Sequence, residues 1–500
     1  MKKLIYRPIL LGLLGLFFFT GQAQVNYSLN YDYDLFETIQ SNSNHIYTYN
    51  MVSKTYDKNE LKIYDLKGVF LNSFEFQART RFALAGVSAM GDNTVFDMQN
   101  GDEHEILIVN KGGKEVARKL ITPEDKLRDF KMLTSTNSIT LVTEVKVKKV
   151  GIGMRVERLN ANLESQWKYE KFGDGKYFFN MAASSQAGNV AVLIKNGNVY
   201  EYSLLTLDAK GTELAFVEVD EQNEGSFTPY LFNYLNDNEL LMVSDFGSTD
   251  AEVFKGIPQG VNIQLINSAT GVISVTNSLS FLEVQNLVGD KKEDGLPVYQ
   301  VGPALRVLDL QTINGMQKLI CESYFLKERK QSVPSSTAGA APTVTYYNQL
   351  QLMDFYLLNL DKPAEEITRI WKQPRTVELE TGSFTKANDM CEKLKYNNMF
   401  SYQGMYNNQL LIRGFGQLHN FYNLIPVDAK MEQMENRIYW GDPINCEANA
   451  VPQRQSYSKG MNYSLPKSMS DEGLLPSANT FMLFDYDGIT NQLLLTELTF

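Results

Sequence analysis

The stretch Leu61-Lys62-Ile63-Tyr64-Asp65-Leu66-Lys67-Gly68 contains the local pattern from which the fold can be predicted. Apolar and polar residues alternate up to Tyr64, and this alternation is typical of a β-strand with one buried face. Asp65 and Gly68 favour a tight turn, because Asp accepts hydrogen bonds from nearby backbone amides and Gly adopts a positive φ without steric penalty. We therefore predict a β-hairpin whose second strand runs from Val69 to Phe76.

The pattern of an apolar residue followed by Asp or Asn recurs along the chain. The Asp or Asn lies at Asp65, Asn110, Asn160, Asp208, Asn267, Asp361, Asp428 and Asp485. Successive positions are 45 to 94 residues apart, and the shorter spacings resemble the roughly 40–50 residues of one four-stranded propeller blade. The longest gap contains residues 327–344, which are of low complexity and lack strand alternation. We predict a flexible exposed loop there.

A second pattern, strand–polar turn–strand, precedes several of these hairpins. It occurs at Phe178–Lys195, Phe232–Ser244, Leu308–Ser323 and Phe400–Gly414. Each such segment joined to the next hairpin makes an antiparallel meander of four strands. The sequence therefore predicts an all-β fold, a single β-propeller of seven or eight four-stranded blades over residues 24–500. Residues 445–479 fit the pattern least, because they are rich in Ser, Pro and Asn.

Two further segments bear on the fold. Thr122–Leu133 is the best candidate for a short helix. Gln492–Phe500 is an alternating strand that ends in Phe, as the chains of outer-membrane barrels often do. An outer-membrane β-barrel is therefore the alternative to the propeller.

Residues 1–23 have the layout of a secretory signal peptide. Lys2, Lys3 and Arg7 precede an apolar run from Ile9 to Phe19, and small residues precede a cleavage point after Ala23. The apolar run has 11 residues, whereas a helix needs about 20 to span a bilayer. We predict export to the periplasm, the outer cell surface or the medium, with no integral membrane segment after cleavage.

Charge and cysteine content narrow the partners and the chemistry. The formal net charge is −11, from 47 Lys and Arg against 58 Asp and Glu, which disfavours binding to nucleic acid and to anionic lipid. Cys321, Cys391 and Cys446 are too few for a disulfide framework in a chain of 500 residues. Buried, inert thiols are the favoured interpretation, although two of the three could pair.

No recognisable catalytic motif is present in the sequence. The three histidines, His45, His104 and His419, are isolated from one another, so we interpret them as single structural or surface residues and predict no metal site and no cofactor. The segments Asp97–Asp102 and Phe484–Gly488 contain spaced oxygen ligands but do not match the full calcium-loop pattern. The catalytic residues of an enzyme on this chain stay unknown at this point.

The tryptophans are informative about packing. Trp167, Trp371 and Trp440 each lie 7 to 12 residues after one of the repeated Asp or Asn positions. This recurring placement favours packing between blades over a carbohydrate-stacking platform.

The leader ending Gly21-Gln22-Ala23-Gln24 and the Asp/Asn hairpins resemble uncharacterised exported β-propeller-like proteins of Bacteroidota-type bacteria. Segments such as Ile266–Gly271 are also similar to quinoprotein-type propellers that act as envelope scaffolds. The resemblance implies a fold and a compartment. We expect an exported non-enzymatic binding or scaffold module of the cell envelope, with an envelope protein or a glycan as partner. The alternative is a carbohydrate-active enzyme, a glycoside hydrolase or lyase, with carboxylates in the central channel. The sequence leaves the oligomeric state open.

Overall fold

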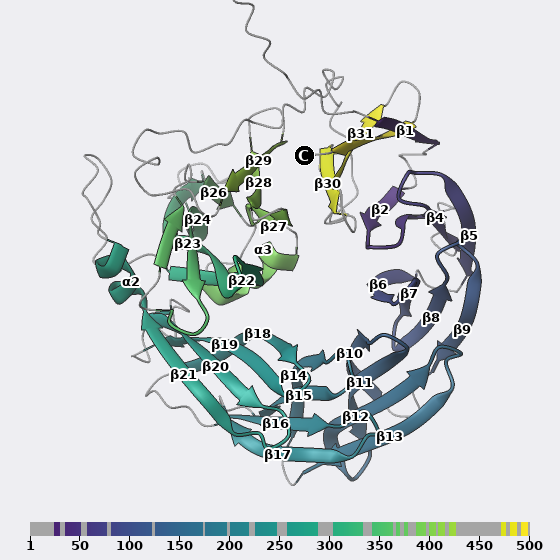
Figure 1. The fold of residues 1–500 in the computed structure, drawn as a ribbon, viewed down its shortest axis with the longest axis horizontal. Coiled ribbons are helices and arrows are strands. Elements are labelled where there is room, and N and C mark those ends of the chain that lie inside the picture. The colour runs from purple at the N-terminus through teal and green to yellow at the C-terminus, as the bar shows by residue number, and fades with distance from the viewer. Residues whose placement is uncertain are drawn as a thin grey trace, which may run out of the picture.

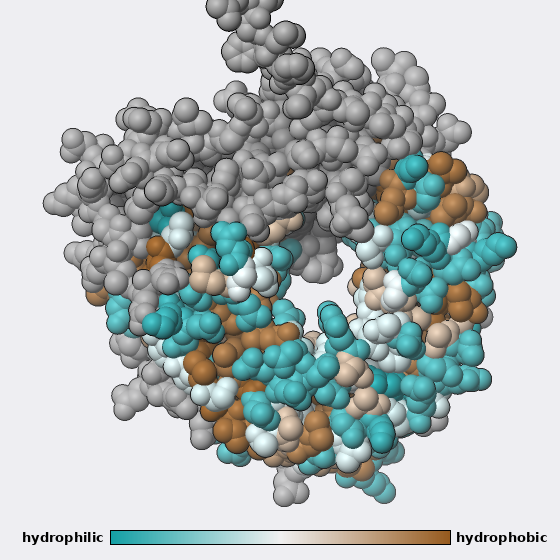
Figure 2. Space-filling model, in the orientation of Figure 1, coloured by the Kyte–Doolittle hydropathy of each residue, from teal (hydrophilic) through white to brown (hydrophobic). Residues whose placement is uncertain are grey.

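The described strands of the computed structural model form eight antiparallel sheets around a central opening (Figure 1). The structure describes residues 25–30, 36–51, 58–77, 82–122, 126–173, 176–197, 201–219, 226–247, 258–288, 304–333, 343–363, 367–370, 375–378, 387–396, 400–406, 409–415, 420–426, 472–476, 481–487 and 492–498. Figure 2 shows the same opening in a space-filling view. The strands form separate sheets, which confirms the predicted β-propeller. The alternative prediction, a single closed sheet, is wrong.

The first five sheets each consist of four consecutive strands, with the first strand nearest the opening and the fourth at the rim (Figure 1). Sheet 1 contains β2 (Phe36–Ser41), β3 (Ile46–Met51), β4 (Lys58–Tyr64) and β5 (Phe70–Gln77). Sheet 2 contains β6 (Ala83–Met90), β7 (Asn93–Asn100), β8 (Glu103–Val109) and β9 (Glu115–Ile121). Sheet 3 contains β10 (Lys126–Thr134), β11 (Ser138–Val147), β12 (Gly151–Asn160) and β13 (Ser165–Phe172). Sheet 4 contains β14 (Tyr177–Ser184), β15 (Val190–Asn196), β16 (Glu201–Leu207) and β17 (Glu213–Val219). Sheet 5 contains β18 (Ser226–Asn236), β19 (Glu239–Gly247), β20 (Gly260–Asn267) and β21 (Ile273–Ser280).

The last three sheets depart from this regular order. Sheet 6 contains β22 (Ala304–Ile313), β23 (Met316–Val333), β24 (Thr343–Asn359) and β25 (Ile367–Ile370), and β26 (Arg375–Glu378) also pairs with β24. Sheet 7 contains β27 (Tyr402–Tyr406), β28 (Gln409–Phe415) and β29 (Asn420–Pro426). Sheet 8 contains β30 (Glu472–Pro476), β31 (Phe481–Asp487), β32 (Gln492–Leu498) and, beyond β32, β1 (Val25–Asn30).

Sheet 8 joins the two ends of the described chain. β1 pairs with β32 in an antiparallel ladder in which Val25 lies opposite Glu497 and Asn30 lies opposite Gln492. The outer position of this sheet, which a fourth consecutive strand fills in sheets 1 to 5, is thus filled from the other end of the chain. The backbone hydrogen bonds of this ladder link the first and last described strands of the chain.

Five of the repeated Asp and Asn residues form the predicted turns. Oδ1 of Asp65 accepts hydrogen bonds from the amides of Lys67 and Val69, at 2.9 and 2.8 Å. At Asn110, Asn160 and Asp208, Oδ1 likewise accepts hydrogen bonds from the amides two and four residues later in the chain. At Asn267 the two donating amides lie two and three residues later. One side-chain oxygen therefore satisfies two amides that the strand ladder leaves unpaired.

The later repeats differ from the prediction. β24 ends at Asn359, whose Oδ1 accepts from the amide of Asp361 at 3.3 Å, so that turn begins two residues earlier than expected. Asp485 lies inside β31 opposite Leu494, and the prediction of a turn there is wrong. The alternation of Phe484-Asp485-Tyr486-Asp487 simply continues the strand. Asp428 lies outside the described residues.

The four predicted strand–turn–strand segments are confirmed, but the helix prediction is wrong. Residues 126–134 form β10, which pairs with β11. The two described helices are α2 (Phe281–Val288) and α3 (Ala387–Tyr396). A capping box starts α2, since Ser280 Oγ accepts from the Glu283 amide at 3.1 Å and a Glu283 carboxylate oxygen accepts from the Ser280 amide at 2.9 Å. Neither helix is long and apolar enough to cross a bilayer, and none other occurs in the described residues.

The prediction of a flexible loop at 327–344 is wrong for half of these residues. Residues 327–333 belong to β23 and residues 343–344 to β24, with Lys327 opposite Gln349 and Val333 opposite Thr343. Residues 334–342 lie outside the described part. A backbone ladder joins the two strands, and such a ladder can form without apolar alternation. The charged run at 327–330 does not look like a strand in the sequence.

Apolar side chains fill the junctions between neighbouring sheets. At the junction of sheets 3 and 4, Val142, Met154 and Val156 pack with residues such as Val192 and Leu205. Trp167 reaches across the same junction, where its Nε1 donates to the Ala209 carbonyl at 3.1 Å. Its ring covers Gly211, at which a Cβ would lie 2.6 Å from the ring. The predicted packing role is confirmed for Trp167, whereas Trp371 and Trp440 lie outside the described residues.

Cys321 and Cys391 are buried free thiols. Burial raises the pKa of the Cys391 thiol to about 12 and raises that of Cys321 as well, so both stay protonated at neutral pH. The interpretation of inert, buried cysteines is confirmed for these two. Cys446 lies outside the described residues.

Candidate binding pocket between sheets 2 and 3

The junction of sheets 2 and 3 contains charged residues where the next junction is apolar. In sheet 4, Val192 pairs with Leu205, three residues before the turn at Asp208, and both are buried against sheet 3. The corresponding pair in sheet 3 is Leu141 and Glu157. The next pair on the same face of sheet 3 is Thr143 and Arg155. Its counterpart in sheet 4 is Ile194 and Ser203. Polar side chains therefore replace part of the apolar packing.

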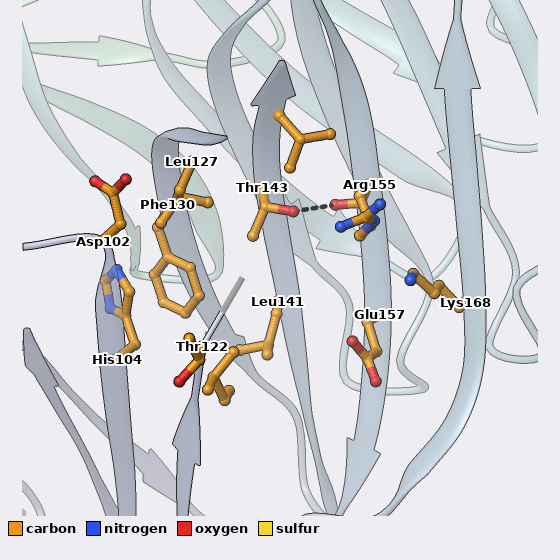
Figure 3. Close-up of a pocket in the computed structure, with 12 residues that line it drawn as sticks. Asp102, His104, Thr122, Leu127, Phe130, Leu141, Thr143, Arg155, Glu157 and Lys168 are labelled. Carbon is orange, nitrogen blue, oxygen red and sulfur yellow. Dashed lines mark hydrogen bonds between the residues drawn. The ribbon is translucent and has the colours of Figure 1, made fainter. Parts of the chain in front are cut away.

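A pocket of about 250 Å³ opens where the apolar packing ends (Figure 3). Sheet 2 and the segment after it, together with all four strands of sheet 3, supply its lining: Asp102, His104, Ile121, Thr122, Leu127, Phe130, Leu141, Thr143, Val145, Arg155, Glu157 and Lys168. Leu127, Leu141 and Val145 are buried. Asp102, Thr122 and Lys168 are exposed. The pocket thus has an apolar interior and a polar mouth.

His104 is the most deeply buried polar side chain of the lining, with 2% exposure. Its Nδ1 lies 2.8 Å from Oδ1 of Asp97, which is also buried, and its ring stacks on Phe130 with centroids 3.7 Å apart. The Asp97 carboxylate accepts the Nδ1 proton, so in the neutral imidazole Nε2 is the acceptor. Nε2 has no hydrogen-bond partner among the described residues. Figure 3 shows His104 and Phe130 ring against ring, with Asp102 beside them.

The opposite wall of the pocket carries paired charges. Arg155 Nε lies 2.7 Å from Oε1 of Glu170, and Lys168 Nζ lies 3.6 Å from the same oxygen. Glu157 lies directly opposite Lys168 in the ladder of β12 and β13. The Thr143 hydroxyl donates to the Arg155 carbonyl at 3.2 Å, the dashed line in Figure 3. This wall is therefore braced by its own hydrogen bonds and ion pairs.

A second charged cluster is buried between sheets 5 and 6. Arg306 is 1% exposed, and its guanidinium carbon lies 3.5 Å from the centre of the Tyr230 ring. Arg306 Nη1 lies 3.3 Å from Asp245 Oδ2, and Nη2 bonds to Glu392 on α3. Burial raises the pKa of Asp245 to about 7, although Arg306 opposes the shift. This cluster joins two sheets and a helix in the interior.

The structure separates the residues that the sequence singled out. His45 is buried between sheets 1 and 2, with Nδ1 2.8 Å from the Thr94 hydroxyl and Nε2 3.2 Å from the Lys111 carbonyl, which is the structural role we interpreted. His419 lies outside the described residues. Asp97 binds His104, whereas Asp102 lies at the pocket mouth, so the two do not form a calcium loop.

Sequence reasoning missed the pocket, although it left a signal. Arg155 and Glu157 lie at ladder positions where the following sheet has Ser203 and Leu205. Among the described residues, no group of three or more His, Cys, Asp or Glu is placed to hold a metal ion.

No protein-family model matches the sequence, and no curated protein matches it. Several solved structures are similar to this chain at low identity. The WD40 domain of SCAP from fission yeast is 11% identical, with a TM-score of 0.41 over 95% of this chain and 98% of that one. The β-propeller domain of the Trilobed protease from Pyrococcus furiosus is 9% identical, with a TM-score of 0.36 over 84% of this chain and 98% of that one. The Dos1 propeller is 9% identical, with a TM-score of 0.33, and the match covers 57% of this chain and 65% of that one. The arrangement of the described sheets makes the chain an all-β protein of the propeller type.

Proposed function

We propose that this protein is an exported, non-enzymatic binding module whose ligand enters the pocket between sheets 2 and 3. The observation that carries the proposal is the pocket itself, which has an apolar interior and a polar mouth at a junction whose neighbour, between sheets 3 and 4, is filled by apolar side chains. Sites that bind small groups combine apolar surface with a few placed polar groups in this way.

The surroundings of His104 favour binding over catalysis. A general base must reach the proton that it abstracts. Phe130 covers one face of the His104 ring, Asp97 engages Nδ1, and Nε2 is buried. The carboxyl group of Asp245, whose pKa is raised to about 7, is also buried, in the cluster between sheets 5 and 6.

Export rests on the leader-like residues 1–23. The test is expression of the full chain in a Gram-negative host, followed by cell fractionation and sequencing of the N-terminus of the mature form. We expect an N-terminus at Gln24 and recovery outside the cytoplasm. An uncut chain that stays in the cytoplasm contradicts this part of the proposal.

A mouth-blocking variant tests the binding site. The melting temperature of the protein is measured against a library of sugars, amino acids, organic acids and short peptides. Ligands of the pocket raise the melting temperature of the wild type, and Thr122→Trp abolishes the rise. Thr212→Trp is the matched control, because Thr212 is also exposed but lies in the turn of sheet 4, away from the pocket.

Two results would contradict the proposal. Equal stabilisation of both variants by every ligand places binding elsewhere. Chromatography of the mixture of protein and ligand detects chemical conversion of a bound ligand. Such conversion replaces the non-enzymatic assignment with the carbohydrate-active alternative.

A further inference from the structure

The charges that line the pocket cancel. Asp102 and Glu157 are acidic, and Arg155 and Lys168 are basic. Glu170 forms ion pairs with both cations and is not one of the lining residues. A ligand with a net charge therefore meets partners of both signs and gains little Coulomb energy. The lining favours a ligand that is neutral and can both donate and accept hydrogen bonds.

Polar groups occur at two levels of the pocket. Asp102 and Lys168 are exposed at the mouth, whereas Thr143 and Glu157 are half-buried on the wall of sheet 3. A ligand with one polar end and one apolar end matches only one of these levels. Hydroxyl groups distributed around a compact body match both, because each hydroxyl can donate to a carboxylate and accept from an ammonium or guanidinium group.

Apolar side chains also line the pocket. Phe130, Leu141 and Val145 line the interior and provide surface for C–H groups. The volume of about 250 Å³ is below the roughly 300–1,000 Å³ of sites for drug-sized ligands, so it suits one small ring. A sugar ring has this combination, with hydroxyl groups around its edge and C–H groups on its faces.

We infer that the pocket binds a neutral sugar ring, as a free monosaccharide or as one unit of a glycan. The inference rests on the proposed function, because it names the ligand class of the same pocket. Glu157 is the main acceptor for sugar hydroxyls from the wall of sheet 3, and Asp102 is the acceptor from the side of sheet 2.

Saturation-transfer NMR on the full chain tests the inference. The probes are glucose, galactose, mannose and xylose, with glucuronate, glucosamine and leucine as charged and zwitterionic counterparts. We expect transfer to the ring C–H protons of at least one neutral sugar. Glu157→Gln keeps the size of the side chain and removes its charge, and should weaken that binding about tenfold, the loss of one charge-assisted hydrogen bond.

Glu201→Gln is the matched control. Glu201 is exposed on β16 of the neighbouring sheet and does not line the pocket, so this variant should bind the sugar as the wild type does. Thr122→Trp should abolish the transfer.

The outcomes separate this inference from the proposed function. Binding only of leucine or of a charged sugar, blocked by Thr122→Trp, overturns the sugar inference and leaves the binding pocket standing. Sugar binding that Glu157→Gln and Glu201→Gln weaken equally also overturns it, because the contact is then not at this wall. When no probe and no member of the wider library binds, both proposals fail.

Discussion

Arg306 provides the sharpest test of how the interior is held together. We consider Arg306→Met, which keeps an unbranched apolar stem and removes the guanidinium group. Arg306 is 1% exposed and contacts the buried Asp245, the ring of Tyr230 and Glu392. The substitution therefore leaves Asp245 buried without its cation.

The expected loss is about 3–5 kcal/mol of unfolding free energy at about pH 8.5, where Asp245, with a pKa of about 7, is ionised in the wild type; this loss is typical of removing one partner from a buried ion pair. The lost cation–π contact with Tyr230 at 3.5 Å is part of this loss. The contact with Glu392 adds little, because that side chain is 50% exposed and an exposed pair contributes at most about 1 kcal/mol.

Urea denaturation of the full chain, followed by fluorescence and circular dichroism, measures these losses. Asp245→Asn combined with Arg306→Met should be less destabilised than Arg306→Met alone, because no uncompensated charge is then buried. Glu392→Gln is the control and should cost less than about 1 kcal/mol. The reasoning is refuted when Arg306→Met lies within 1 kcal/mol of the wild type, or when the double variant loses at least the sum of both single losses.

Two other predictions concern pH and packing. The folded pKa of Asp245 is raised to about 7 from an ordinary 3.8, so the proton that it binds stabilises the fold below pH 3.8, and this stability is lost as the pH rises through 7. Relative to Asp245→Asn, the wild type should lose roughly 3 kcal/mol between pH 4 and pH 7 in urea denaturation, and a flat difference across this range contradicts the assignment. Gly211→Ala should cost about 2–5 kcal/mol, because φ is +82° and the new Cβ would lie 2.6 Å from the Trp167 ring. Gly101→Ala, at φ +65° with open space around it, should cost only about 1–2 kcal/mol, and equal losses for the two glycines would show that the ring contact is irrelevant.

The fold could be predicted because its turn chemistry is local. One carboxylate or amide oxygen and the amides two to four residues on define the turns at Asp65, Asn110 and Asp208, and all of these groups lie in one short segment of sequence. Their spacing then indicates the repeat. The same rule fails at Asp485. An apolar residue followed by Asp also occurs there, but inside a strand in which Asp and aromatic residues alternate.

Other features depend on pairing that no short segment reveals. The ladder of β1 and β32 joins residues more than 460 positions apart. In the ribbon of β23 and β24, the charged run at 327–330 pairs with residues 346–349, which carry no charge. The start of α2 was recognisable, since Ser280 and Glu283 have the spacing of a capping box, but that signal was missed.

The pocket could not be predicted as a site, because residues from two sheets make it. Asp102 and Lys168 are 66 positions apart in sequence, and only the packing of sheet 2 against sheet 3 brings them to one mouth. The substitution of Glu157 at a repeat position where sheet 4 has Leu205 shows that the packing changes there. It does not show that a cavity results.

Hydrogen exchange of the full chain, measured by mass spectrometry with and without the ligand that most raises the melting temperature, tests the central claim most directly. The account predicts that protection concentrates in residues 102–104, 121–130 and 141–145, and that it disappears in Thr122→Trp. Protection confined to β14 and β18 at the central opening, with 102–104 and 141–145 unchanged, would contradict it.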